Sequence, residues 1–163
     1  MDQPILISAC LLGIPCRYDG NSNPLPQLVK LLSCNQVVIP FCPETQGGLT
    51  IPRLPAEIVK GDGALVLGGK AKVINKDGED YTEQFLKGAE AVLQMATSIN
   101  PKLIILKSKS PSCGLGRIYD GSFRGRLRQG DGVTSALLRQ ASFQLVTEIE
   151  LLTFGQILAK NYW

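Results

Sequence analysis

The chain has 163 residues, of which 44% are hydrophobic and 19% are charged. These values are typical of one globular domain with its own core, here expected over residues 1–163, and they exclude a disordered chain. The net charge of +3 is small and no dense run of Lys or Arg alternates with aromatic residues, so we expect no nucleic-acid partner. Histidine is absent, which excludes Ser-His-Asp triads, Cys-His nucleophile pairs and histidine-ligated zinc or iron.

The amino terminus carries Ile7-Ser8-Ala9-Cys10, which superficially resembles a lipoprotein cleavage site. A signal peptide needs a basic leader and an apolar stretch of roughly 7–15 residues, whereas the leader here is Met1-Asp2-Gln3-Pro4. No run approaches the roughly 20 apolar residues of a membrane span. We therefore expect a cytoplasmic protein that does not bind a membrane. In that reducing location, cysteines bind metal or catalyse reactions rather than form disulfides.

The first half of the chain alternates apolar runs with turn-forming segments. The patterns predict a buried strand at residues 4–9, a helix at 24–33 and a second strand, buried on both faces, at 36–41. Residues 42–57 hold three prolines and two glycines and predict a long loop. Structureless loops above roughly 12 residues are often functional. Residues 64–67 and 71–74 predict a hairpin around Gly68-Gly69.

The second half continues the alternation of helices and strands. The predicted elements are an amphipathic helix from about Tyr81 to Ser98, a strand Leu103–Lys107, a helix from about Val133 to Ala141, a strand Gln144–Thr147 and a helix from about Leu151 to Lys160. Residues 114–132 are rich in Gly and Arg and predict a loop. This order is the signature of an α/β fold. We expect a three-layer sandwich around a mostly parallel, Rossmann-like sheet.

Three of the five cysteines follow strand-like apolar runs: Cys10, Cys42 and Cys113. The carboxyl ends of parallel strands lie along one edge of a sheet, where ligands bind, so we expect these cysteines to meet. Cys16 lies six residues after Cys10, across the same strand-exit loop. Cys34 lies in a helix-to-strand connection with no partner pattern, and we expect an inert buried cysteine there.

A clustered soft site in a chain without histidine must be built from thiolate, which favours an iron–sulfur cluster. Structural zinc sites normally show Cys-x-x-Cys pairs, and this chain has none. Cluster irons are usually held by four thiolates. A site with three thiolates leaves one iron open, which then acts as a Lewis acid toward substrate sulfur or oxygen. The alternative is a module that binds a cluster or zinc, or carries sulfur, without catalysis of its own.

Polar residues accompany the cysteines. Glu44 follows Cys42 by two residues and is placed to act as a general acid or base, the alternative being a solvated loop glutamate. Ser110, in Ser-Pro-Ser-Cys, is placed to hydrogen-bond a substrate, the alternative being a turn-forming serine before proline. Arg53 and Glu57 predict an ion pair on the loop.

Several motifs occur in a fixed order along the chain. They are Ser8-Ala9-Cys10-Leu11-Leu12-Gly13, Cys16-Arg17-Tyr18-Asp19-Gly20, Cys42-Pro43-Glu44, Gly47-Gly48-Leu49, Pro52-Arg53, Pro55-Ala56-Glu57, Leu106-Lys107-Ser108, Ser110-Pro111-Ser112-Cys113-Gly114 and Tyr119-Asp120-Gly121-Ser122-Phe123. Together they resemble the bacterial DUF523 family, which includes the thiouracil desulfurases, and the resemblance covers nearly the whole chain. It implies a [4Fe-4S] enzyme that removes sulfur from 2-thiouracil without net redox chemistry. Three cysteines would bind the cluster, and the open iron would take the thiocarbonyl sulfur.

The resemblance also implies the residues that form the site. They are Cys10, Cys42 and Cys113 as cluster ligands and Glu44 and Ser110 as catalytic residues. Cys16 also belongs to the family motif and is the alternative ligand to Cys10. The implied partner is a small thiolated base, and a related base or another sulfur compound is an alternative substrate.

Overall fold

The computed structural model describes residues 3–28 and 36–153. The strands are β1 (Ile5–Ser8), β2 (Val38–Phe41), β3 (Ala56–Val59), β4 (Lys72–Asn75), β5 (Leu103–Leu106), β6 (Arg117–Tyr119), β7 (Leu127–Gln129) and β8 (Leu145–Thr147). The helices are the 3-10 helix η1 (Ala9–Leu12) and the α-helices α2 (Pro43–Gln46), α3 (Gly63–Leu67), α4 (Thr82–Ile99) and α5 (Val133–Gln140). Half of the predicted helix 24–33, Cys34 and most of the predicted helix 151–160 lie outside the described residues.

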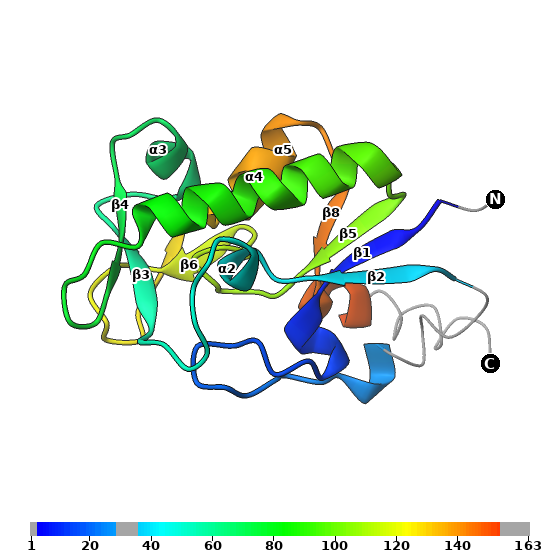
Figure 1. Ribbon diagram of the computed structural model, residues 1–163, viewed down its shortest axis with the longest axis horizontal. Coiled ribbons are helices and arrows are strands. Elements are labelled where there is room, and N and C mark those ends of the chain that lie inside the picture. The colour runs from blue at the N-terminus through cyan, green and yellow to red at the C-terminus, as the bar shows by residue number, and fades with distance from the viewer. Residues whose placement is uncertain (1–2, 29–35, 154–163) are drawn as a thin grey trace.

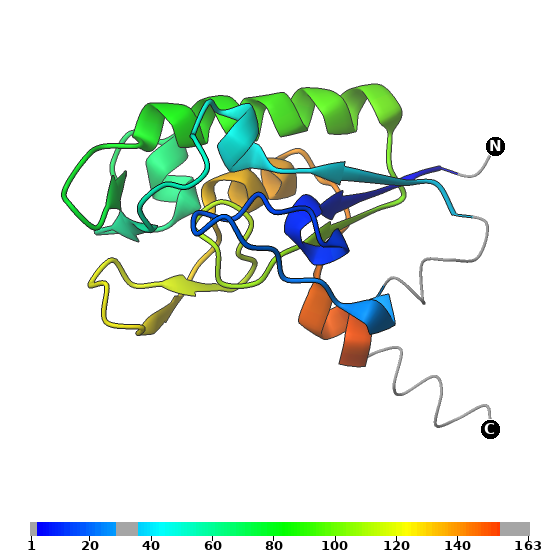
Figure 2. The ribbon, with the colours of Figure 1, turned by 60° about the horizontal axis from the view of Figure 1, so that its bottom comes forward.

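The centre of the fold is a four-stranded parallel sheet in the order β2-β1-β5-β8. Every residue of β1 is buried, as expected for a parallel strand covered on both faces. Helices α4 and α5 lie on one side of this sheet (Figure 1), and η1 and the helical residues 148–153 lie on the other (Figure 2). The predicted α/β fold with helices on both sides of a parallel sheet is confirmed.

Helix α4 is the longest described helix and agrees with its predicted range to within one residue at each end. Its buried residues Phe85, Ala89, Val92 and Ala96 follow one face at helical spacing and pack toward the core. Asn100 ends the helix in the left-handed conformation, with φ of 46°, which asparagine tolerates better than most residues.

Helix α2 packs backbone to backbone against α4, and two glycines make this approach possible. A Cβ atom added at Gly88 would lie 1.9 Å from the carbonyl oxygen of Pro43, and one added at Gly47 would lie 1.9 Å from that of Gln84. Any larger residue at either position would push the two helices apart. This contact fixes α2, and with it Glu44, relative to the end of β2.

The predicted hairpin at residues 64–67 and 71–74 is wrong. Residues 63–67 form α3, whose N-cap Asp62 accepts a hydrogen bond from the Leu65 backbone N–H at 3.1 Å. Strand β4 instead pairs antiparallel with β3. The short apolar run at 64–67 fits a helix and a strand equally well, and the Asp-Gly that precedes it was the decisive helix signal.

Both predicted loops contain regular structure. Residues 42–57 hold α2 and the start of β3, because Pro43 occupies the first helical position, where its missing N–H is no disadvantage. Residues 114–132 hold the antiparallel β6–β7 hairpin. Within the described residues, no helix combines the length and the apolar character needed to cross a membrane.

Candidate active site

The carboxyl ends of β1, β2 and β5 meet at one edge of the sheet, and the segments that follow them line a cavity of about 410 Å³. The residues from these segments that line it include Cys10, Cys16, Cys42, Glu44, Ser110, Ser112 and Cys113. All five residues predicted as ligands or catalytic groups therefore lie on one cavity, together with the alternative ligand Cys16. The predicted meeting of the cysteines at this sheet edge agrees with the structure.

The four thiols are free of disulfide bonds, and Cys10, Cys16 and Cys113 are buried, whereas Cys42 is half-buried. A hydrogen bond with Cys10 raises the pKa of Cys16 to about 11. Burial also raises this pKa, whereas a hydrogen bond with Cys42 lowers it. The hydrogen bond with Cys16, followed by burial, raises the pKa of Cys42. Burial raises the pKa of Cys113 to about 12. The raised pKa values favour the protonated thiols of Cys16, Cys42 and Cys113, so a metal group that binds any of these three must displace its proton.

The donor set fits an iron–sulfur cluster better than a single metal ion. In the described part of the chain, no three His, Cys, Asp or Glu side chains converge on one point as the ligands of a lone zinc ion do. Cys10, Cys16, Cys42 and Cys113 instead line one cavity together. A cubane cluster suits such a set of thiols, because each of its irons takes one thiolate.

Glu44 is held by an arginine and a serine. Arg53 Nε donates to Glu44 Oε2 at 2.9 Å, and Ser112 Oγ donates to Glu44 Oε1 at 3.0 Å. The Arg53 side chain is only 3% exposed, and its Nη2 also donates to the Cys16 carbonyl oxygen at 3.0 Å. Arg53 thus fixes Glu44 and the loop of Cys16 together. The predicted ion pair between Arg53 and Glu57 is wrong.

Ser110 and Ser112 organise the loop before Cys113. Ser110 Oγ accepts hydrogen bonds from the backbone N–H groups of Ser112 and Cys113, both at 3.1 Å, as a turn-forming serine does. The two hydroxyl oxygens lie 2.9 Å apart. Because Ser112 donates to Glu44, Ser110 donates to Ser112, and the three side chains form one continuous chain of hydrogen bonds. A role for Ser112 was not predicted from the sequence, although its place directly before Cys113 was a usable signal.

A buried carboxylate ties the ends of β5 and β8 together beside the cavity. Glu148 accepts hydrogen bonds from the Ser108 backbone N–H at 2.8 Å and from Ser108 Oγ at 2.7 Å. It also pairs with Lys107 Nζ at 3.2 Å, and the Lys107 backbone N–H donates to Ser8 Oγ at 3.0 Å. These bonds fix the exit of β5 relative to β1 and β8, and nothing in the local sequence pattern indicated them.

Comparisons with known proteins agree with this geometry. A family model for 2-thiouracil desulfurase matches residues 5–150, a range that contains every residue lining the cavity. The chain is 47% identical over 147 residues to the uncharacterized protein YbbK of Bacillus subtilis (strain 168), covering 90% of this chain and 97% of that protein. The solved structure of a [4Fe-4S]-dependent thiouracil desulfidase, TudS (DUF523Vcz), matches with a TM-score of 0.81 and 38% identity, over 97% of this chain and 99% of that one.

Proposed function

The chain belongs to the 2-thiouracil desulfurase family, and on that premise we propose that it is a [4Fe-4S]-dependent desulfidase of a small thiolated pyrimidine such as 2-thiouracil. In the overall reaction, water supplies the oxygen of the new carbonyl, sulfur leaves as sulfide, and no net electron transfer occurs. The observation that carries the proposal is the shared cavity, in which buried thiols lie beside a hydrogen-bonded carboxylate.

We propose that Cys10, Cys42 and Cys113 hold the cluster. When bound, the cluster supplies an iron without a protein ligand, a Lewis acid for the thiocarbonyl sulfur. Cys10, Cys42 and Cys113 come after β1, β2 and β5, which are adjacent strands of the sheet. The rigid sheet therefore helps to fix the positions of their thiols. Cys16 lines the same cavity and is the alternative ligand to Cys10.

Glu44 is the proposed acid–base group. A carboxylate at this position accepts a proton from the attacking water and later returns one to the leaving group or the ring. Arg53 and Ser112 hold the two carboxylate oxygens in place, so Glu44 does not have to reorganise during the reaction. The chain of hydrogen bonds through Ser112 to Ser110 offers a path for the proton along the cavity wall.

The test is anaerobic reconstitution of the protein with iron and sulfide, followed by incubation with 2-thiouracil. We expect uracil and sulfide to appear in equal amounts. If protein that holds about four irons releases neither product, the proposal is wrong for this substrate. A Glu44→Gln variant is the matched control: it should keep its iron and lose turnover.

The alternative was a cluster, zinc or sulfur carrier without catalysis of its own. A carrier has no use for a carboxylate that an arginine and a serine hold beside the thiols, so the contacts of Glu44 speak against it. Turnover of 2-thiouracil that persists in Glu44→Ala would assign the acid–base role to another group. The absence of a nucleic-acid partner and the cytoplasmic location stay predictions.

A further inference from the structure

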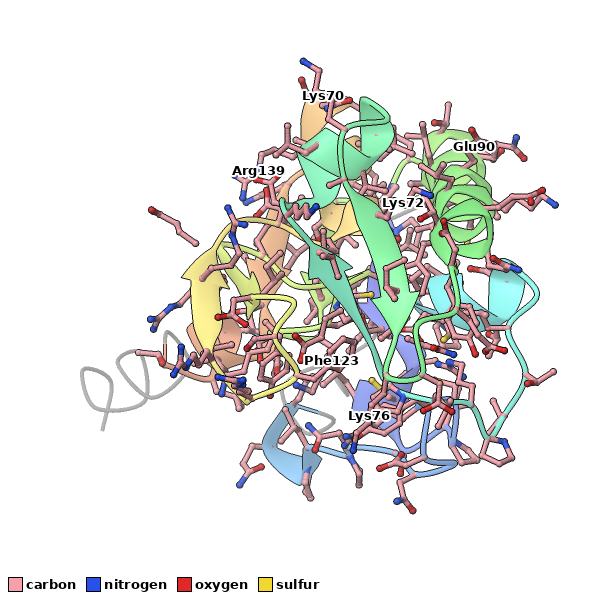
Figure 3. The ribbon with its side chains drawn as sticks, turned by 90° about the vertical axis from the view of Figure 1, so that its left-hand side faces the viewer. Lys70, Lys72, Lys76, Glu90, Phe123 and Arg139 are labelled. Atoms are coloured by element: carbon pink, nitrogen blue, oxygen red, sulfur yellow. The ribbon has the colours of Figure 1, made fainter. Side chains whose placement is uncertain are left out.

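The cavity has a second wall, built from residues outside the central sheet. We call it the hairpin wall: Glu57 and Lys76 from the β3–β4 hairpin, and Tyr119, Phe123 and Gly125 from the β6–β7 hairpin. Figure 3 shows Phe123 and Lys76 on this end of the molecule. The motifs Pro55-Ala56-Glu57 and Tyr119-Asp120-Gly121-Ser122-Phe123, which the proposed reaction leaves without a role, both lie in this wall.

The backbone of Phe123 adopts a conformation that bulky residues rarely take. Its φ is 56°, in the left-handed region that favours glycine or asparagine. Phe123 also belongs to none of the apolar core clusters of the described residues, so its ring does not serve the core. A strained aromatic residue that lines a cavity and adds nothing to the core points to a role in binding.

Glu57 stabilises this strained conformation. Its Oε2 accepts hydrogen bonds from the Gly121 backbone N–H at 2.8 Å and from the Phe123 backbone N–H at 3.0 Å. Glu57 is only 8% exposed. Hydrogen bonds from N–H groups to a buried carboxylate are strong and directional, so Glu57 holds the two backbone groups in place. Glu57 does not form the pair with Arg53 that was predicted from the sequence, but holds the turn that carries Phe123.

The turn is also packed tightly onto β3. Gly121 has φ of 88°, and a Cβ atom there would lie 2.6 Å from the carbonyl oxygen of Ile58. Asp120 Oδ1 accepts a hydrogen bond from the Ser122 backbone N–H at 2.9 Å, which tightens the turn further. These contacts hold the backbone of Phe123 in one position on the cavity wall.

We propose that Phe123 recognises the substrate by stacking its ring on the face of the planar pyrimidine, and that Glu57 is the positioning residue that holds Phe123 for this contact. The inference rests on the proposed function and deepens it: the site selects thiocarbonyl compounds with a flat, conjugated ring. Stacking of two rings is strongest when the ligand ring is planar. The hydrogen-bonding groups of the ligand stay the same whether its ring is planar or puckered.

The test uses two ligands that share their hydrogen-bonding groups and differ in the planarity and conjugation of the ring. Uracil, the expected product, and 5,6-dihydrouracil carry the same carbonyl and N–H groups, but dihydrouracil is puckered. Equilibrium dialysis on the cluster-loaded protein measures the dissociation constant of each. Stacking of a base on an aromatic side chain is worth enough that the wild-type protein should bind uracil about tenfold more tightly than dihydrouracil. In Phe123→Leu, this ratio should fall to about two, because the apolar volume stays and the aromatic face is lost.

The control for a general loss of packing is Phe143→Leu. Phe143 is half-buried, packs against an apolar core cluster and does not line the cavity, so its loss should leave the tenfold ratio unchanged. A ratio near one in the wild-type protein, or the wild-type ratio preserved in Phe123→Leu, would overturn the stacking contact while turnover of 2-thiouracil still supports the proposed function. Wild-type protein that neither binds uracil nor releases sulfide would overturn both.

The role of Glu57 is tested by a double-mutant cycle with the same two ligands. Glu57→Ala should lower the uracil-to-dihydrouracil ratio as Phe123→Leu does, and the double variant should show no further decrease, because the two residues act through one contact. Glu57→Gln keeps a carbonyl acceptor and should restore most of the ratio. Independent, multiplicative effects of the two substitutions would show that Glu57 does not act through Phe123.

Discussion

The two walls of the cavity differ in origin and in chemistry. The wall at the sheet edge, called here the sheet wall, carries the four thiols, Glu44 and the serines on segments that leave parallel strands. The hairpin wall carries an aromatic ring, a buried carboxylate and a lysine on antiparallel hairpins outside that sheet, and it contributes no thiol among the described residues. From this comparison we infer that the sheet wall positions the reacting groups and that the hairpin wall determines which substrate binds.

The largest expected effect is on cluster binding, which should depend on the sheet wall alone. Cys10→Ala, Cys42→Ala and Cys113→Ala should each lose or strongly weaken iron binding after reconstitution, whereas Cys16→Ala should keep it. Phe123→Leu, on the hairpin wall, should bind wild-type amounts of iron. Iron quantification and visible absorption of the five variants check this.

Two outcomes of that experiment would correct the ligand assignment. Loss of iron from Cys16→Ala with retention in Cys10→Ala would exchange the two cysteines. Loss in all four cysteine variants would indicate a cluster with four protein ligands, which leaves no open iron.

The second prediction separates proton transfer from cluster binding within the sheet wall. Glu44→Gln should keep its iron and lower the turnover of 2-thiouracil by about 100-fold or more, the usual contribution of a general acid or base. Single-turnover sulfide release measures this rate. An unchanged rate in Glu44→Gln would remove this carboxylate from the reaction.

The third prediction concerns the carboxylate that supports the sheet wall. Glu148→Ala leaves the buried N–H and hydroxyl of Ser108 without their acceptor and Lys107 without its carboxylate partner, so it should destabilise the fold by about 3 kcal/mol. Urea denaturation measures the change, with the exposed Glu90→Ala as the control for loss of a glutamate. Equal stability of the two variants would mean that water replaces the hydrogen bonds of Glu148 with no change in the free energy of unfolding.

The fourth prediction tests the contact that fixes α2. Gly88→Ala should destabilise the protein by about 1–3 kcal/mol, because the new methyl group overlaps the Pro43 carbonyl. Gly68→Ala is the matched control, since a Cβ atom there would meet nothing closer than the Ala64 carbonyl oxygen at 3.5 Å and its φ is an ordinary −82°. Similar unfolding curves for the two alanine variants would show that the helices adjust freely.

The smallest effect is the pH dependence that Asp80 contributes through its pair with Lys72 on β4. Hydrogen bonds from Thr82, then Lys72, lower the pKa of Asp80 to about 2, from about 4 in an unfolded chain. Its folded pKa is depressed, so its contribution is present above pH 4 and is lost as the pH falls toward 2. Because the pair with Lys72 is exposed, this contribution should be about 0.5 kcal/mol or less. Unfolding of Asp80→Asn should therefore lose part of the wild-type pH dependence between pH 4 and pH 2.

The two walls also differ in how far the sequence predicted them. Continuous apolar runs before Cys10, Cys42 and Cys113 marked buried parallel strands, and the parallel sheet then required their ends to meet. The hairpin wall had no such rule. Glu57 acts through backbone groups more than sixty residues away, which no local pattern encodes. The pairing of Arg53 with Glu44, nine residues apart, was missed because nothing in the sequence shows how the loop after α2 folds back.

The place of β1 between β2 and β5 has a consequence for the order of events during synthesis. Cys113 leaves the ribosome about a hundred residues after Cys10, so the nascent chain displays an incomplete set of thiols for most of its elongation. The cavity is complete only once β5 has docked beside β1, and both strands bury apolar side chains in that docking. We therefore expect the chain to fold on its apolar core before it receives the cluster, so that the cluster-free protein is already folded.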